Sequence, residues 1–193
     1  MSRRAQTSSF DVFCRDSIDL IRSARTPFLL IGGLAVIALG VARTTADIDL
    51  VAYADPGRAA ALIDLARAAG FTAAHDELAR MEATGTLRFK RGPFQLDIIL
   101  ASLPFESAAL ERAQRKRLFG RLVPLPTPED LLLFKVLAGR DKDLHDAVGI
   151  ARRHLARLDR RYLERSINQV CDLAEDLTAK RQLEAVLAKA ASA

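Results

Sequence analysis

The chain has 193 residues, of which 50% are hydrophobic, so it can bury one sizeable core or one core with a small helical appendage. Its longest uncharged run, residues 26–42, is too short and too rich in glycine for a membrane span, and the two cysteines lack metal-ligand spacing, so we expect a reduced, cytoplasmic protein with no membrane partner. The net charge of +5 permits a phosphate-rich partner, whereas 6% aromatic residues and no tryptophan argue against stacking platforms for single-stranded bases.

The first part of the chain predicts an alternation of helices and strands. Amphipathic spacing predicts a helix before Pro27, apolar runs predict strands, and Gly40 and Gly70 supply helix stop signals. The elements expected here are a helix over 9–24, a buried strand over 28–31, a short helix over 33–39, a strand over 47–53 and a helix over 58–69.

The middle of the chain is rich in extended patterns. Residues 86–90 alternate in polarity, a turn follows at 91–93, and residues 94–100 form a second strand, so we predict a hairpin. A helix that is basic on one side is expected over 105–118. Two prolines predict an extended segment over 122–126, because proline disfavours helix at the residue before it.

From Thr127 onward the pattern is almost entirely helical. Thr127 is a capping residue, Pro128 takes the first helical position, and acidic residues fill the first turn. Helices are predicted over 127–138 and 141–155, with one or two more over 160–191. We therefore expect an α+β protein, in which an α/β core over 1–126, a small mixed sheet flanked by helices, is followed by a helical C-terminal region over 127–193 that packs against it.

Three aspartates are placed for metal chemistry. Asp47 and Asp49 lie two residues apart at the start of a predicted strand, so their side chains project from the same face. Asp97 lies in a largely apolar strand, where a carboxylate is costly unless it is paired or binds a metal; a solvent-facing edge position is the alternative. Carboxylates from two neighbouring strands suit one or two Mg²⁺ ions that hold a triphosphate.

These aspartates belong to a longer ordered set of motifs. The set comprises Gly32-Gly33, Arg43-x-Thr45-x-Asp47-x-Asp49, Asp97 in a later strand, Lys135 in a helix, and Lys142-Asp143-x-x-Asp146. With this set the chain resembles the DNA polymerase β-like nucleotidyltransferase superfamily, over about residues 28–150. The Arg-x-Thr-x-Asp-x-Asp variant is similar to one branch, the AbiEii-type toxin nucleotidyltransferases and their small relatives.

The resemblance implies a nucleotidyltransferase fold and a Mg²⁺-dependent transfer of NMP from an NTP to an acceptor hydroxyl. It gives Asp47, Asp49 and Asp97 the catalytic and metal-binding roles. It gives nucleotide-binding roles to Gly32, Gly33, Arg43, Thr45, Lys135, Lys142, Asp143 and Asp146. The acceptor would be RNA such as a tRNA end, a protein, or a small molecule, and a toxin role would add an antitoxin protein as a partner.

Several of these residues also admit a purely structural role. Arg43 either neutralises phosphate or pairs with a motif aspartate in the absence of metal, and Thr45 either binds the triphosphate or shapes the turn. Lys135 either contacts phosphate or extends from its apolar helix to solvent. The 142–146 segment either lines the active-site cleft that the family resemblance implies or forms a surface ion pair of little energetic value.

Two rival functions remain open from the sequence. Gly33 stands where many active members have serine, which removes a phosphate-binding hydroxyl and favours a catalytically silent nucleotide- or partner-binding module. Retention of all three aspartates argues for an enzyme, and an aminoglycoside-modifying nucleotidyltransferase is a further alternative. Arginine clusters lie at 112–121, 152–153 and 157–165. They are either solvated helix faces or contacts for the phosphates of an RNA partner.

Overall fold

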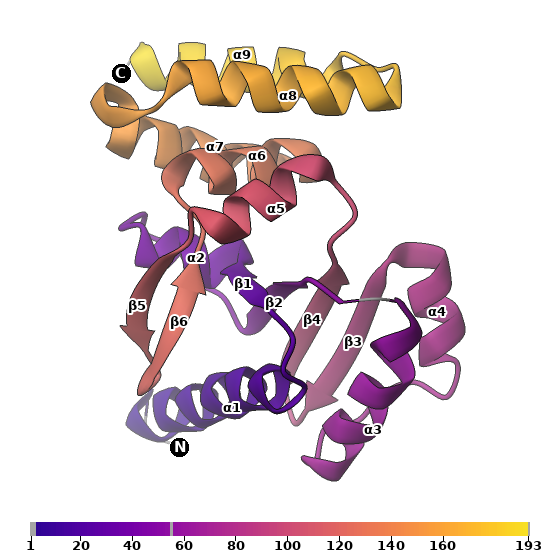
Figure 1. The fold of residues 1–193 in the computed structure, drawn as a ribbon. Helices are drawn as coiled ribbons and strands as arrows, with labels where there is room; N and C mark the ends of the chain where they lie inside the picture. The colour runs from indigo at the N-terminus through magenta and orange to yellow at the C-terminus, as the bar shows by residue number, and fades with distance from the viewer. Residues whose placement is uncertain (1–2, 55, 193) are drawn as a thin grey trace. The chain divides into compact units, whose positions relative to one another are not determined.

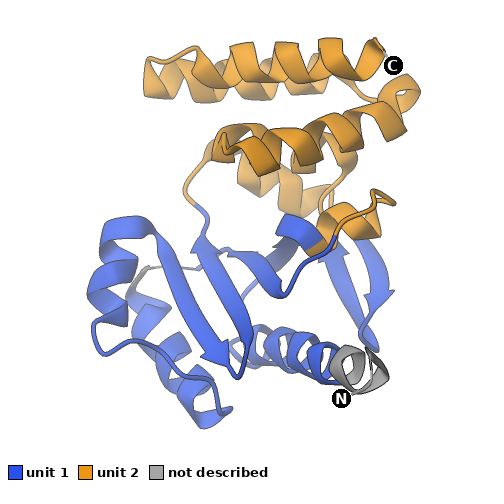
Figure 2. Ribbon diagram, turned by 180° about the vertical axis from the view of Figure 1, so that it is seen from behind, with its two compact units in different colours: residues 1–33, 44–101, 114–125 blue, residues 34–43, 102–113, 126–193 orange. Residues whose placement is uncertain are grey.

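The computed structural model describes residues 3–54 and 56–192, and Figure 1 shows its helices and strands. The chain divides into two compact units, coloured separately in Figure 2. Unit 1 comprises Met1–Gly33, Thr44–Ala101 and Gln114–Leu125, and unit 2 comprises Leu34–Arg43, Ser102–Ala113 and Pro126–Ala193. None of the helices in the described part of the chain has the length and apolar character that a membrane span requires.

A four-stranded mixed sheet forms the centre of unit 1. Its strands are β1 (Phe28–Ile31), β2 (Asp47–Ala52), β3 (Thr86–Arg91) and β4 (Phe94–Leu100). Their order is β1-β2-β4-β3, in which β2 runs antiparallel to β1 and parallel to β4, and β3 runs antiparallel to β4. The predicted strands and the predicted hairpin are confirmed, and so is the expected α+β class with a small mixed sheet.

Helices pack on this sheet through apolar and aromatic side chains. They are α1 (Arg3–Ser23), α3 (Ala59–Ala68) and α4 (Glu77–Thr84), with a short 3-10 turn, η1 (Pro56–Arg58), before α3. Phe13 of α1 lies 5.7 Å from Phe71 and 5.3 Å from Phe94 between ring centroids, and the guanidinium of Arg91 lies 4.5 Å from the Phe71 centroid. Helix α4 was not predicted, because its polar sequence carries little periodic apolar signal.

The predicted helix over 105–118 is wrong in its second half. Helix α5 (Pro104–Glu111) ends early, and β5 (Gln114–Leu118) and β6 (Arg121–Leu125) form a separate two-stranded antiparallel sheet. Phe119 and Gly120 join the strands with φ angles of 50° and 74°, both in the left-handed region that two-residue hairpin turns require. Arginine and lysine are good helix formers, but helix propensity is a weak determinant of structure, and strand pairing overrides it here.

Unit 2 is helical. It contains α5, α6 (Pro128–Ala138), α7 (Asp141–His154), α8 (Arg160–Ala174) and α9 (Thr178–Ala191), a 3-10 turn η2 (Leu155–Arg157), and the last five residues of α2 (Gly32–Ala38). The predicted start of α6 is confirmed, because Thr127 Oγ1 accepts a hydrogen bond from the Asp130 amide at 3.3 Å. Leucines 131, 132 and 133 are fully buried in the core of this unit.

A buried polar network ties α6 to α8 and to the end of α5. Asp130 is fully buried and accepts hydrogen bonds from the Tyr162 hydroxyl and from Arg112 Nε, the latter at 3.2 Å. The Arg112 guanidinium also lies 3.9 Å from the Tyr162 ring centroid. Burial and the hydrogen bond to Asp130 raise the pKa of Tyr162 to about 12, so the phenol stays protonated and keeps donating at neutral pH.

Candidate active site

The parallel pairing of β2 with β4 places two of the three predicted carboxylates side by side. Asp49 is the register partner of Asp97, and Asp47 is the partner of Gln95. Register partners in a sheet point to the same face, and residues two apart along a strand share that face. Ile48, between the two aspartates of β2, is fully buried on the other face. All three aspartates therefore rise from one face of unit 1's sheet, as the sequence predicts.

Gly32 lies against the Asp49 carboxylate. β1 ends at Ile31, the register partner of Asp49, and the chain then turns at Gly32 with a φ of 66°. A Cβ added to Gly32 would lie 1.8 Å from Asp49 Oδ2, a distance that no real side chain can adopt. Glycine is thus required here both for its backbone conformation and because the Asp49 carboxylate occupies the space that a Cβ would take.

Asp97 is held by an arginine that the sequence reasoning missed. Arg88 of β3 is its antiparallel register partner, and the Nε and Nη2 atoms of Arg88 each lie 2.8 Å from one oxygen of Asp97. Gln95 Nε2 donates a further hydrogen bond to Asp97 at 3.2 Å. The hydrogen bond to Asp97 raises the pKa of Arg88 above its usual value, so the guanidinium stays charged. The Arg88 side chain is 45% exposed and that of Asp97 14%.

The donor chemistry of this face fits a divalent cation. Three carboxylates supply the hard oxygen ligands that Mg²⁺ prefers, and the missing side chain at Gly32 leaves room for the Asp49 carboxylate. Within the described residues, however, no three side chains of the metal-ligating types are gathered closely enough to hold an ion. Arg88 engages both oxygens of Asp97, so a cation and this arginine would compete for the same carboxylate.

Thr45 shapes the turn that leads into β2. Its hydroxyl accepts a hydrogen bond from the Asp47 amide at 3.3 Å, which is the structural alternative that the sequence leaves open. Gly33 is buried in the first turn of α2.

The remaining predicted residues belong to unit 2, where four of them form an ion-pair cluster whose lysine and two aspartates are buried. Lys135 of α6 is 4% exposed, and its Nζ lies 2.8 Å from a carboxylate oxygen of Asp143 and 2.8 Å from one of Asp146. Arg43 pairs with Asp146, and Arg140 pairs with Asp143. The two alternatives of a solvent-directed Lys135 and a surface ion pair are therefore wrong, because Lys135, Asp143 and Asp146 are buried.

The charges of this cluster stabilise one another. Burial would raise the pKa of Asp143, but hydrogen bonds from Arg140 and Lys135 outweigh it and hold that pKa below its usual value. Asp143 is therefore ionised at neutral pH and balances the buried lysine. Lys142, by contrast, is exposed, so it does not share the burial of Asp143 and Asp146. Removing one member of such a cluster leaves an uncompensated buried charge, which typically costs about 3–5 kcal/mol.

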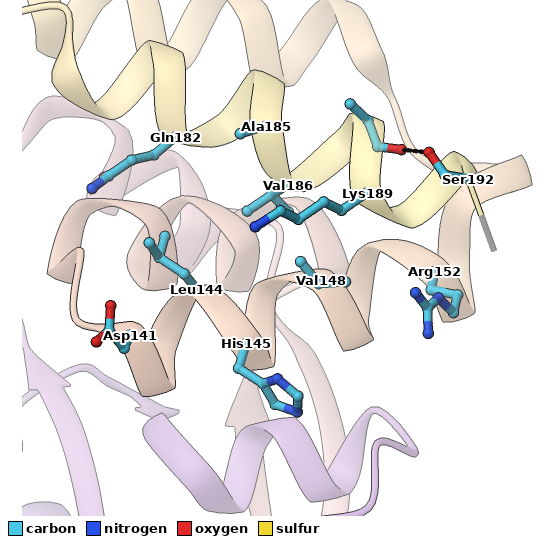
Figure 3. Close-up of a pocket in the computed structure, with 11 residues that line it drawn as sticks. Asp141, Leu144, His145, Val148, Arg152, Gln182, Ala185, Val186, Lys189 and Ser192 are labelled. Atoms are coloured by element: carbon cyan, nitrogen blue, oxygen red, sulfur yellow. Dashed lines mark hydrogen bonds between the residues drawn. The ribbon is translucent and has the colours of Figure 1, made fainter.

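Unit 2 also contains a pocket of about 800 Å³ between α7 and α9, shown in Figure 3. Leu144, Val148 and Val186 contribute apolar lining, while Arg152 and Lys189 bring positive charge from the two helices. None of the residues predicted for the site lines this pocket. The pocket is thus distinct from both the aspartate face of unit 1 and the ion-pair cluster.

No family model matches the sequence, and no curated protein is significantly similar to it. Solved structures share its fold, among them the antibiotic-resistance factor ANT(2'')-Ia in solution, with 16% identity, a TM-score of 0.51, and coverage of 96% of this chain and 92% of that one. A crystal structure of ANT(2'')-Ia with adenylyl-2''-tobramycin gives 15% identity, a TM-score of 0.51, and coverage of 94% and 97%. The lincosamide antibiotic adenylyltransferase LnuA bound to lincomycin gives 19% identity, a TM-score of 0.49, and coverage of 72% and 94%.

These identities lie below the level at which function follows from likeness, so the comparisons establish the fold. The ANT(2'')-Ia structures show that the chain has the nucleotidyltransferase fold. This agrees with the fold that the ordered motifs imply.

Proposed function

We propose that the protein is a Mg²⁺-dependent nucleotidyltransferase that transfers NMP from an NTP to an acceptor hydroxyl and releases pyrophosphate. One observation carries the proposal: Asp49 and Asp97 are register partners on parallel strands, with Asp47 on the same face and the bare backbone of Gly32 against Asp49. A structural sheet has no need for three carboxylates on one face, because like charges on neighbouring strands destabilise it.

The residues on this face would have different roles in the reaction. The acceptor oxygen bonds to the α-phosphorus, the bond from that phosphorus to the bridging oxygen breaks, and pyrophosphate leaves. Asp47, Asp49 and Asp97 would hold Mg²⁺, which when bound neutralises charge on the triphosphate and on the phosphoryl oxygens. The Asp97 carboxylate would also accept the proton of the attacking hydroxyl. The glycine pair lets the main chain approach the phosphates without obstruction by a Cβ.

Arg88 must release Asp97 before that carboxylate can take part. The pair is partly exposed, and exposed ion pairs contribute only about 0–1 kcal/mol, so opening it costs little. The guanidinium thus keeps the Asp97 carboxylate oriented until substrate and cation arrive. The nucleotide-binding roles of Arg43, Thr45 and the 135–146 residues stay predictions of the family resemblance.

Two candidate functions within this class of enzyme differ in the acceptor that receives the nucleotide. The motif variant at residues 43–49 supports placing the chain near the AbiEii-type toxins, with RNA or a tRNA end as acceptor and an antitoxin protein as partner. Likeness in fold to a structure that holds adenylyl-2''-tobramycin favours a second candidate, an aminoglycoside acceptor. Growth arrest on expression supports the toxin, and protection from an aminoglycoside supports the second candidate.

A transfer assay tests the proposal. The protein is incubated with each NTP labelled at the α-phosphate, Mg²⁺, and total RNA, a protein extract or an aminoglycoside, and pyrophosphate release is followed. Label on one acceptor supports the enzyme, provided that Asp49→Asn abolishes it. Asp64→Asn is the matched control, because it removes an exposed carboxylate of α3 outside the site. Absence of transfer to every acceptor would favour the catalytically silent module.

A further inference from the structure

The β5–β6 hairpin of unit 1 concentrates positive charge. Its two strands carry Arg115, Lys116, Arg117 and Arg121, and the sequence has no acidic residue between Glu111 and Glu129. Figure 1 shows the two strands side by side, and β6 contacts β1 and α1. The hairpin therefore differs from helices such as α7 and α8, in which acidic and basic residues are interspersed.

Strand geometry sorts these charges onto two faces. Arg115 and Arg117 are two residues apart, so they project from the same face, at a separation of about 7 Å along the strand. Both are exposed. Their cross-strand partners on that face are Pro124 and Leu122, and Leu122 is 47% exposed. We call the face formed by these four residues the outer face of the hairpin.

The opposite face holds the hairpin in place. Val123 and Leu125 are buried there. Arg121 forms two hydrogen bonds of 2.7 Å to the Asp19 carboxylate of α1, and Arg22 of the same helix donates to the Leu122 carbonyl oxygen. The arginines of the outer face thus belong to a hairpin that is anchored through β6, so little backbone freedom is lost when they bind a ligand.

The outer face has cations but no counter-charge. Neither Arg115 nor Arg117 forms an ion pair with any residue that the structure describes, whereas Arg121 is matched by Asp19. Like charges that share one strand face repel each other and destabilise the sheet. An external anion with several charges, spaced along a chain, would relieve that repulsion at both positions.

We propose that the outer face of the β5–β6 hairpin binds the phosphate backbone of a nucleic acid. The guanidinium fork matches phosphate oxygens in geometry, and two forks on one strand suit successive phosphates of a polynucleotide. Leu122 is one apolar side chain, too little for membrane insertion, which needs a whole apolar helix face or a lipid chain. The surface does not depend on the transferase proposal, because binding at the hairpin involves none of the aspartates.

Salt-dependent binding tests this surface. A fluorescent single-stranded RNA oligonucleotide is titrated with the protein, without NTP, at 50–200 mM salt, and the slope of log K against log salt concentration is measured. Each phosphate contact on a single strand contributes about 0.7 to this slope, so Arg115→Gln/Arg117→Gln should lower it by about 1.4 and weaken binding severalfold at low salt. Arg161→Gln/Arg165→Gln, at two exposed positions of α8, removes the same charge and should leave the slope unchanged.

The outcomes separate the alternatives. An unchanged slope and affinity in the hairpin variant overturn the proposal, and so does an equal loss in both double variants, because that would report net charge alone. If the hairpin variant loses binding to vesicles of anionic lipid but still binds RNA, the proposal is also overturned, and the outer face is a membrane-binding surface instead. Asp49→Asn should bind RNA as the wild type does. RNA binding by a wild-type protein that transfers nucleotide to no acceptor would support the hairpin surface and contradict only the transferase.

Discussion

Arg88 and Asp97 face each other across the β3–β4 ladder and form two parallel hydrogen bonds of 2.8 Å. The pair places a fixed cation on the carboxylate that we assign to catalysis. It also sets the balance between a closed site, in which Arg88 holds Asp97, and an open site, in which Asp97 is available for a metal ion.

Replacing Arg88 should therefore favour the open site. We expect Arg88→Ala to bind Mg²⁺ severalfold more tightly, as measured by calorimetry, because the ion no longer competes with the guanidinium. The free energy of unfolding should fall by less than about 1 kcal/mol, since the pair is partly exposed. Weaker Mg²⁺ binding in the variant would show that Arg88 supports the metal site instead of competing with it.

Gly32 should be intolerant of any side chain. Gly32→Ala adds a Cβ 1.8 Å from Asp49 Oδ2, so Asp49 must move, and we expect loss of transfer activity with a loss of several kcal/mol of stability. Gly92→Ala is the matched control, because Gly92 also has a positive φ, 59°, but has open space where the Cβ would lie. It should lose only the conformational strain of about 1–2 kcal/mol. Equal losses in chemical denaturation would mean that the contact with Asp49 is unimportant.

The buried cluster of unit 2 should make stability depend on pH. Asp143→Asn is expected to lower the free energy of unfolding by about 3 kcal/mol at pH 7, because part of the charge that balances Lys135 is removed. The pKa of Asp143 is lower in the folded chain, so its stabilisation is present above the unfolded value of about 4 and is lost as pH falls through the folded value.

The measurement is urea unfolding of both proteins from pH 7 to pH 2.5. The difference between wild type and Asp143→Asn should be constant at the upper end and shrink below about pH 4. Asp141→Asn, an exposed neighbour in the first turn of α7, should cost no more than about 1 kcal/mol, through the helix dipole. A pH-independent difference for Asp143→Asn would contradict the assigned charge state.

The left-handed backbone at the end of α8 should favour glycine over alanine. Glu175 adopts a left-handed conformation, with φ of 51° and ψ of 33°, at an exposed position where glycine is the favoured residue. Glu175→Gly should be more stable than Glu175→Ala by about 1 kcal/mol, because only alanine carries a Cβ into that conformation. Thermal unfolding of the two variants measures this, and a more stable alanine variant would rule out strain at this position.

The sequence predicts the aspartate face better than it predicts the partners of its residues. Alternation along β2 is a local property, so the shared face of Asp47 and Asp49 follows directly from their spacing. The partner of Asp97 would follow from a shorter turn than the one predicted over 91–93: a two-residue turn at Gly92 and Pro93 pairs Arg91 with Phe94, and the same register then pairs Arg88 with Asp97. The signal was the exact length of the turn.

Other features could not be predicted from local patterns. The burial of Lys135 depends on two aspartates from the next helix and on Arg43, which lies 92 residues before Lys135 in the chain (135 − 43). The β5 strand depends on pairing with β6, because its charged residues carry no apolar alternation of their own. Contacts between residues that are distant in the sequence determine both the burial of Lys135 and the formation of β5. Neither feature produces a periodic pattern of apolar residues.

The central claim is that the aspartate face of unit 1 transfers nucleotides. Its most direct test is the rate at which label from an α-labelled NTP appears on an acceptor, compared among wild type, Asp49→Asn and Asp64→Asn at saturating Mg²⁺. We predict transfer by wild type and Asp64→Asn, and a loss of at least a hundredfold in Asp49→Asn. Equal rates in Asp49→Asn and wild type would contradict the account.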